Sequence, residues 1–180
     1  MMPEWDLIRR FRAGDRDAFS SLYRVHYPSV FRFALHMTGD RLKAGEITQD
    51  VFVWLIHHAG DFDPARGELA AFLIGVTRKL IQRRSQTESR FVPFDDMAER
   101  PDRGLWDRDE RESDAAELRK AIGALPERYR EAVVLCDLEE KSYEEAAALL
   151  QCALGTVRSR LHRARELLAK KLRARQRCSV

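Results

Sequence analysis

The sequence predicts an all-α protein in which two small helical domains are joined by a flexible linker. Apolar residues recur at helical spacings through most of the chain, whereas the alternating pattern of β-strands is nearly absent. Residues 86–113 are rich in Asp, Glu and Arg, contain Pro93 and Pro101, and have no sustained period. The predicted boundaries are therefore 1–85 for the first domain, 86–113 for the linker and 114–180 for the second domain.

Five helices are predicted in the first domain, each from an apolar stripe with a start or stop signal. They are a short helix ending near Gly14, a helix capped by Asp15 or Asp17, a third from Pro28 to Gly39, a fourth from about Leu42 to Ala59, and a fifth from about Glu68 to Arg84. Proline suits the first turn of a helix, because the N–H that it lacks has no intrahelical partner there. We therefore expect a helix boundary at Pro28.

The fourth predicted helix is apolar on two opposite sides. At about 100° per residue, one side holds Ile47, Val51, Trp54, Leu55 and His58 and is expected to face the core. The other side holds Phe52, Val53 and Ile56, with Glu46, Gln49 and Asp50 as a polar rim. A helix that is apolar nearly all round is either buried on both sides or exposes one side to a partner protein. We expect an exposed docking face and keep full burial as the alternative.

Basic and aromatic residues mix at the end of the first domain. They are Phe62, Arg66, Phe72, Arg78, Lys79, Arg83 and Arg84. Such combinations bind single-stranded nucleic acid, because bases stack on aromatic rings while cations follow the phosphates. Phe62 and Phe72 are individually also typical core residues, so the prediction depends on the cluster as a whole.

The second domain is predicted to contain helices over 114–125 and 126–138, followed by a helix-turn-helix over 142–165. Ser142 followed by Glu145 is the signature of a capping box, which starts a short helix. The pattern breaks after Gln151, and a second helix begins at about Thr156. Two short helices, a tight turn and a basic outer face are typical of this DNA-binding motif. An ordinary helical hairpin is the alternative.

The last predicted helix has one apolar face and one polar, basic face. Val157, Leu161, Ala164 and Leu168 are spaced by four, three and four residues and share the apolar face. The opposite face holds Ser159, His162, Arg163 and Glu166, with Arg158, Arg160 and Arg165 on its flanks. The net charge of the whole chain is +3, but residues 141–180 carry ten Lys or Arg against three Glu, or +7. This concentration of charge indicates a polyanionic partner.

Several classes of protein are not supported by the sequence. The three cysteines are isolated, which argues against a disulfide framework or a zinc cluster. The N-terminus lacks the apolar region of a signal peptide, and the longest apolar run, 51–56, is too short to span a membrane. We expect a cytoplasmic protein with no membrane insertion. His57, His58, Asp61 and Asp63 lack a metal-ligand spacing, so we expect neither catalysis nor a cofactor.

Taken together, these motifs resemble bacterial RNA polymerase sigma factors of the extracytoplasmic-function (ECF) class. The most specific stretches are L-P-E-R-Y-R-E-A-V-V-L (125–135), S-Y-E-E-A-A (142–147) and G-T-V-R-S-R-L-H-R-A-R (155–165). The first domain adds D-A-F-S-S-L-Y (17–23), I-T-Q-D-V-F (47–52) and F-D-P-A-R-G (62–67). The resemblance covers nearly the whole chain and implies sigma region 2 in the first domain and sigma region 4 in the second.

The resemblance also implies a role for each surface. The first domain would dock on the clamp coiled coil of the largest polymerase subunit through Glu46, Gln49, Asp50, Phe52, Val53 and Ile56. The −10 promoter element would be melted and captured by Asp61, Arg66, Phe72, Arg78, Lys79 and Arg83. At the −35 element, Arg158, Ser159, His162 and Arg163 would read bases, while Thr156, Arg160 and Arg165 would hold phosphates. The expected partners are core RNA polymerase, including its flap, together with promoter DNA and an anti-sigma factor.

The chain also departs from the family pattern. The family usually has Trp, Asn and Asp where this chain has Phe72, Lys79 and Arg83, so capture of −10 bases is expected to differ. In the helix-turn-helix, Ala146, Gln151, Cys152 and Ala153 replace a usual Ile, Gly, Ile and Pro. We expect strain of roughly 1 kcal/mol if Gln151 adopts a positive φ, and a marginally stable second domain. A stand-alone helix-turn-helix regulator that needs no polymerase is the alternative function; the promoter sequence and the inducing signal are left open.

Overall fold

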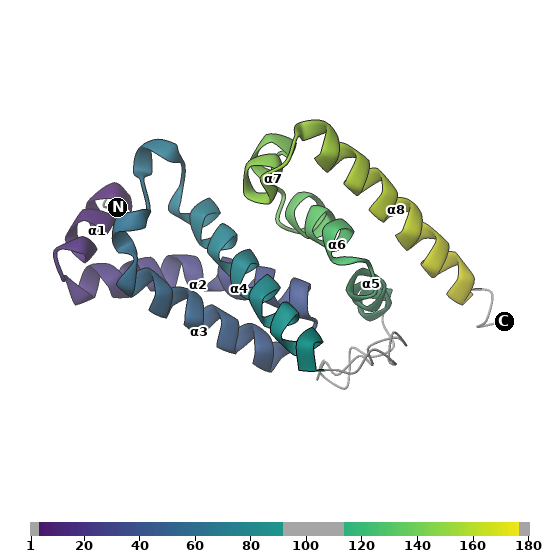
Figure 1. The fold of residues 1–180 in the computed structure, drawn as a ribbon, viewed down its shortest axis with the longest axis horizontal. Coiled ribbons are helices and arrows are strands. Elements are labelled where there is room, and N and C mark those ends of the chain that lie inside the picture. The colour runs from purple at the N-terminus through teal and green to yellow at the C-terminus, as the bar shows by residue number, and fades with distance from the viewer. Residues whose placement is uncertain (1–3, 92–113, 177–180) are drawn as a thin grey trace.

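A computed structural model of the chain describes residues 4–91 and 114–176. Every regular element within these ranges is helical, and the helices gather in two groups, one on each side of the molecule (Figure 1). Residues 4–91 form the N-terminal domain and residues 114–176 the C-terminal domain. The predicted all-α fold class is confirmed. Residues 92–113, the greater part of the predicted linker, lie outside the described residues, as do residues 177–180.

The N-terminal domain is built around one long central helix. Its elements are α1 (Glu4–Arg12), α2 (Arg16–Thr38), α3 (Arg41–His57) and α4 (Leu69–Phe91), with the short 3-10 turns η1 (Ala59–Asp61) and η2 (Pro64–Arg66) between α3 and α4. Helix α2 contacts α1, α3 and α4, and the core between them includes Leu22, Val30, Val51, Leu55, Phe62 and Leu73. Each such side chain contributes about 1.5–3 kcal/mol through its burial. Helix α4 ends at Phe91, beyond the predicted end at Arg84.

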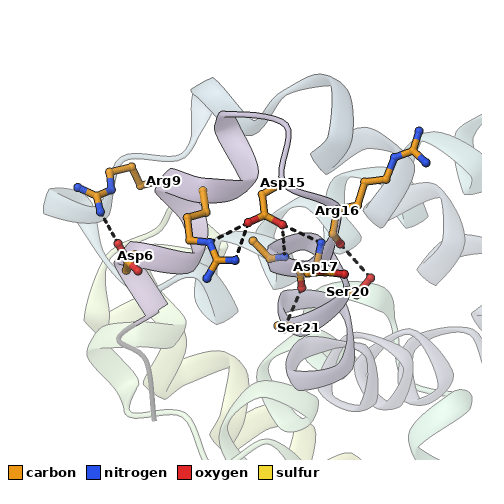
Figure 2. Close-up of polar contacts among 9 residues, drawn as sticks. Asp6, Arg9, Asp15, Arg16, Asp17, Ser20 and Ser21 are labelled. Atoms are coloured by element: carbon orange, nitrogen blue, oxygen red, sulfur yellow. Dashed lines mark hydrogen bonds and ion pairs between the residues drawn. The ribbon is translucent and has the colours of Figure 1, made fainter.

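The start of α2 is set by Asp15, which caps it. The side-chain Oδ1 of Asp15 accepts hydrogen bonds from the backbone N–H groups of Asp17 at 2.9 Å and Ala18 at 3.1 Å (Figure 2). Its other oxygen accepts one from Nε of Arg10 at 2.8 Å, which ties the end of α1 to the start of α2. At the far end, Gly39 closes the helix with φ at 67°, a conformation that favours glycine.

The predicted helix boundary at Pro28 is wrong, because α2 runs through this residue without a break. Pro28 has no N–H to donate to the carbonyl group of Arg24, and a proline inside a helix costs about 3 kcal/mol. Both residues are exposed, so water can reach the unpaired carbonyl. Leu22 before the proline and Val30 after it are buried in the same core. This packing favours a single continuous helix.

The C-terminal domain contains three α-helical segments that pack beneath a long last helix. Its elements are α5 (Asp114–Gly123), α6 (Glu127–Val133), the π-helical turn η4 (Val134–Leu138), α7 (Tyr143–Leu150) and α8 (Leu154–Gln176). The single helix predicted over 126–138 is therefore divided between α6 and η4. The N–H of Glu139 donates to the carbonyl of Val134 at 2.9 Å, five residues back, which is the hydrogen-bond pattern of a π-turn.

The two domains share part of one hydrophobic core. Phe33 and Met37 of α2 and Ile74 of α4 are buried in the same cluster as the core residues of the C-terminal domain. The other buried members of this cluster are Ala121, Ile122, Leu125, Ala132, Val133, Val134, Leu135, Ala146, Leu150, Val157, Leu161, Ala164 and Leu168. Helix α4 packs against α7, and α2 packs against α5 and η4. Side chains of the N-terminal domain thus complete the hydrophobic core of the C-terminal domain.

Candidate polymerase-docking and DNA-binding surfaces

The helix-turn-helix predicted at the C-terminus is present as α7, a tight turn and α8. Oγ of Ser142 accepts the N–H of Glu145 at 3.1 Å, and the Glu145 carboxylate accepts the N–H of Ser142 at 2.7 Å. This is the predicted capping box, and the hydrogen bond from the Ser142 N–H holds the pKa of the Glu145 carboxyl below its usual range. Gln151 ends α7 with φ at 52°, a left-handed conformation that favours glycine.

Helix α8 divides into the two faces that its spacing predicts. Val157, Leu161, Ala164 and Leu168 are buried. Arg158, Ser159, His162, Arg163 and Arg165 are exposed, whereas Thr156 and Arg160 are half-buried at the edge of the face. A row of cations and small polar groups on an exposed helix can enter the DNA major groove and contact base edges and phosphates.

Three contacts between basic side chains and carboxylates orient the basic face of α8. Nη1 of Arg163 lies 2.9 Å from Oε2 of Glu166, and the same carboxylate lies 3.5 Å from Nε2 of His162. The hydrogen bond between Arg163 and Glu166 raises the pKa of Arg163 and lowers the pKa of Glu166. Nη2 of Arg165 lies 2.6 Å from Oδ1 of Asp137, so this side chain is turned toward η4. A phosphate contacted by Arg165 would compete with Asp137 for this guanidinium.

The expected docking face on α3 is exposed, with one correction. Val53 and Ile56 are 49% and 50% exposed, and Gln49 lies in solvent between Glu46 and Val53. Phe52 is only 3% exposed, so the expectation that it lies on this face is wrong. Its ring packs 4.6 Å from that of Tyr23 and 6.5 Å from that of Phe19, measured between centroids. Phe52 is buried because it packs against these two aromatic rings of α2. A helical wheel of α3 alone cannot show this contact.

Sequence reasoning missed one member of this face. Leu42, in the first turn of α3, is 72% exposed and lies on the same side as Val53 and Ile56. Its spacing was the available signal, because positions 42, 46, 49, 53 and 56 are separated by four, three, four and three residues. We call Leu42, Glu46, Gln49, Val53 and Ile56 the docking stripe.

The polar edge beside the docking stripe is braced by the end of α4. Nη1 of Arg84 lies 3.0 Å from Oε2 of Glu46, and its Nη2 lies 2.5 Å from Oδ2 of Asp50. Burial lowers the pKa of Arg84, but the hydrogen bonds that Arg84 donates to both carboxylates outweigh it and raise the pKa above its usual range. Arg84 therefore forms ion pairs with two carboxylates of α3. By its sequence position, it belongs to the basic and aromatic residues expected to bind nucleic acid.

The residues predicted for nucleic-acid binding in the first domain differ in their exposure. Asp61, Arg66, Lys79 and Arg83 are exposed along the loop after α3 and on α4. Phe62 is 5% exposed and belongs to the core. Phe72 is half-buried, with its ring 5.3 Å from that of Phe62 and 5.8 Å from that of Trp54. Arg78 faces the C-terminal domain, where its Nε lies 2.5 Å from Oε1 of Glu131.

Other kinds of site find no support in the described part of the chain. No three His, Cys, Asp or Glu side chains within residues 4–91 and 114–176 come together in a group suited to a metal ion. His58 stacks on Trp54 with ring centroids 4.4 Å apart, and so packs against α3. None of the described helices is long and apolar enough to cross a membrane.

Comparison with known proteins places both domains in one family. The Sigma-70 region 2 model matches residues 22–91, and the Sigma-70 region 4 model matches residues 115–168. These ranges correspond to α2–α4 and to α5–α8, the elements that carry the docking stripe and the basic face of α8.

Individual relatives agree with this assignment. The chain is 36% identical over 165 residues to ECF RNA polymerase sigma factor SigE of Mycolicibacterium smegmatis, covering 86% of this chain and 63% of that protein. It is 31% identical over 180 residues to the ECF RNA polymerase sigma-E factor of Haemophilus influenzae, covering 92% of this chain and 93% of that protein. A co-crystal structure of the sigma factor RpoE with the anti-sigma factor NepR from Bartonella quintana is similar, with a TM-score of 0.67 and 26% identity over 86% of this chain and 96% of that chain. This chain therefore belongs to the ECF family of RNA polymerase sigma factors.

Proposed function

We propose that this protein binds core RNA polymerase and directs it to initiate transcription at promoters that carry a matching −10 and −35 element. The docking stripe on α3 would contact polymerase, the loop after α3 together with α4 would contact the −10 element, and α8 would read the −35 element. Membership of the ECF sigma family supports this role, and so does the presence of both domains in one chain.

The observation that carries the proposal is the exposure of the docking stripe. Leu42, Val53 and Ile56 are 72%, 49% and 50% exposed on a helix whose opposite side is fully packed. Positions in the stripe recur on average every 3.5 residues, the repeat with which helices pack in coiled coils. The stripe therefore fits a helical, coiled-coil partner such as the clamp of the largest subunit. The alternative function, a stand-alone regulator, does not require an exposed apolar stripe on α3.

The −35 contacts proposed for α8 follow from its exposed face. Arg158, Ser159, His162 and Arg163 would reach base edges, while Thr156, Arg160 and Arg165 would contact phosphates on the flanks. At the −10 element, Asp61, Arg66, Phe72, Lys79 and Arg83 remain the proposed contacts, with Arg78 available only after it leaves Glu131.

We also propose an anti-sigma partner that covers the docking stripe until a stress or envelope signal removes it. The similar RpoE structure contains an anti-sigma factor. An exposed apolar stripe that awaits polymerase offers such a partner a ready binding surface.

Runoff transcription tests the proposed function. Purified core polymerase and this protein are combined on DNA that carries the protein's own upstream region, with a template scrambled at the −35 element as control. We expect a discrete transcript only when both proteins and the intact template are present. A protein that binds the DNA specifically but yields no transcript with core polymerase would instead be a stand-alone regulator.

A further inference from the structure

The last residue of α1 contacts the backbone of the loop between α3 and α4. Nε of Arg12 donates to the carbonyl of Ala59 at 3.0 Å, and its Nη2 donates to the carbonyl of Phe62. The first of these carbonyls lies at the start of the turn η1, and the second directly follows its end. A guanidinium is planar and holds its donors in a fixed fork, so one side chain can fix two backbone groups relative to each other. We call these two hydrogen bonds the loop contact.

The turn η1 has little internal support of its own. Its backbone hydrogen bond runs from the N–H of Asp61 to the carbonyl of His58, at 2.9 Å. A single 3-10 turn has poorer hydrogen-bond geometry than an α-helix, and its middle residue is Gly60, a residue type that loses more conformational freedom on folding than any other. Hydrogen bonds from a charged donor are stronger than those between neutral groups. The two bonds from Arg12 are therefore a main source of order in this turn.

Helix α1 is itself fixed to α2 near both of its ends. Near its start, Oε1 of Glu4 lies 2.8 Å from Nε2 of His26, which is buried. Near its end, Nε of Arg10 donates to Oδ2 of Asp15 at 2.8 Å. Arg12 therefore extends from a helix whose position relative to α2 is well defined.

Other side chains of α1 pack against the same loop. Ile8 and Phe62 are each 5% exposed and belong to one hydrophobic cluster, against which Phe11 also packs. The ring of Phe62 lies 5.3 Å from that of Phe72 on α4, measured between centroids. Phe62 is thus held in two ways, because the core packs around its ring while Arg12 binds its carbonyl.

The residues near Phe62 in the loop are those proposed to meet the −10 element. Asp61 precedes it and Arg66 follows it, and both are exposed. The intervening turn η2 has a cap of its own, since Oδ1 of Asp63 accepts the N–H of Ala65 at 3.0 Å. A loop that is already ordered binds more tightly, because the entropy of ordering it is not lost on binding.

We propose that Arg12 is a positioning residue for the −10 element. By holding the carbonyls of Ala59 and Phe62, it presents the loop in one conformation to the unpaired bases of single-stranded DNA. Arg12 acts through the loop and does not itself need to touch DNA. This role rests on the proposed function, in which the loop after α3 contacts the −10 element. The match to the Sigma-70 region 2 model begins at residue 22 and so does not include α1.

Amide hydrogen exchange in the free, full-length chain, followed by NMR, tests the loop contact. Arg12→Lys keeps the charge, but an ammonium group lacks the planar fork of donors. We expect the Asp61 amide to exchange at least about tenfold faster in this variant, because exchange follows the free energy of local opening. The Gly39 amide, which donates to the carbonyl of Leu35 at 2.8 Å, is the internal reference and should be unchanged. Arg16→Lys, at the exposed first residue of α2, is the matched control and should match the wild type.

Binding of single-stranded DNA tests what the loop contact is for. The probe is a fluorescent oligonucleotide with the non-template sequence of the −10 region in the protein's own upstream DNA, and the protein is bound to core RNA polymerase. We expect Arg12→Lys and Arg12→Gln to weaken binding equally, by about tenfold if the variant loop keeps the binding conformation one tenth of the time. A direct phosphate contact would behave differently, since lysine also binds phosphate and would preserve most of the affinity. Arg16→Lys and Arg16→Gln repeat both changes as controls and should bind like the wild type.

The outcomes separate the two proposals. An Asp61 amide that exchanges no faster in Arg12→Lys would overturn the loop contact. Faster exchange with wild-type affinity for the oligonucleotide would overturn the positioning role, and a loss of affinity in Arg12→Gln alone would assign Arg12 to a phosphate instead. Faster exchange in a chain that does not bind core polymerase would overturn the proposed function and the −10 role with it, while the loop contact would stand.

Discussion

Arg163 and Glu166 form an ion pair on the exposed face of α8, with Nη1 2.9 Å from Oε2. The two residues are one helical turn apart, so the pair holds the guanidinium along the helix. Exposed pairs of this kind contribute little to stability, because water competes for both charges. In the proposed complex with the −35 element, Arg163 can therefore exchange the Glu166 carboxylate for a base edge at little cost.

Arg163→Ala should weaken binding to the cognate −35 duplex by about 5- to 150-fold if the guanidinium reads a base. Fluorescence anisotropy with cognate and scrambled duplexes at fixed salt measures the effect. The scrambled duplex should be bound as before. Arg173→Ala, at an exposed position further along α8, is the matched control and should not change the preference for the cognate duplex. Equal weakening on both duplexes would assign Arg163 to a phosphate.

Asp15→Ala should lower the melting temperature of the chain by about 4 °C, because α2 loses the acceptor for two of its first N–H groups. Asp15→Asn keeps a good capping oxygen and should lose much less. Thermal unfolding followed by circular dichroism compares the three proteins at pH 7. Equal losses for the two substitutions would mean that the cap contributes little and that the contact with Arg10 matters most.

The same residue should make stability depend on pH. Hydrogen bonds from the Ala18 N–H and from Arg10 lower the pKa of Asp15 below its ordinary value of 3.8 in the folded protein. The stabilisation is therefore present above pH 3.8 and is lost as the pH falls through the lowered value. We expect the wild type to lose its stability advantage over Asp15→Asn as the pH falls below 3.8. An advantage that is unchanged at low pH would contradict this account of the cap.

Gln151→Gly should stabilise the protein by about 0.5–1 kcal/mol, because glycine adopts the observed φ of 52° without strain. Urea unfolding gives the change in free energy. Gln151→Ala is the control, since alanine retains the Cβ and should bring no such gain. A glycine variant no more stable than the alanine variant would show that the turn between α7 and α8 is not strained.

The features predicted from sequence were reliable where the signal lies within one helix. Val157, Leu161, Ala164 and Leu168 follow the 3.6-residue period and are buried as predicted, and Ser142 caps α7 as its spacing with Glu145 indicates. These features depend on residues one or two turns apart, so local spacing contains the information.

The misses share a different physical cause, namely packing between distant segments. Pro28 predicts a boundary locally, but the core on both sides keeps α2 continuous. Phe52 falls on the outer side of α3 by helical angle, yet Phe19 and Tyr23 on α2 cover it. Arg78 has the charge of a DNA contact, but Glu131, 53 residues away, accepts its hydrogen bond. A helical wheel shows the faces of one helix and cannot show which residues of other helices pack against them.

The docking stripe is the central claim, and Ile56→Asp tests it most directly. Ile56 is 50% exposed, so the substitution should leave the helices folded while placing a charge in an apolar contact. Val25→Asp, at a 65% exposed position on α2, is the matched control. We expect Ile56→Asp to weaken binding to core polymerase at least about 30-fold and to abolish runoff transcription. Binding to the −35 duplex and the behaviour of Val25→Asp should match the wild type. Wild-type affinity and transcription for Ile56→Asp would contradict the assignment of this face to polymerase.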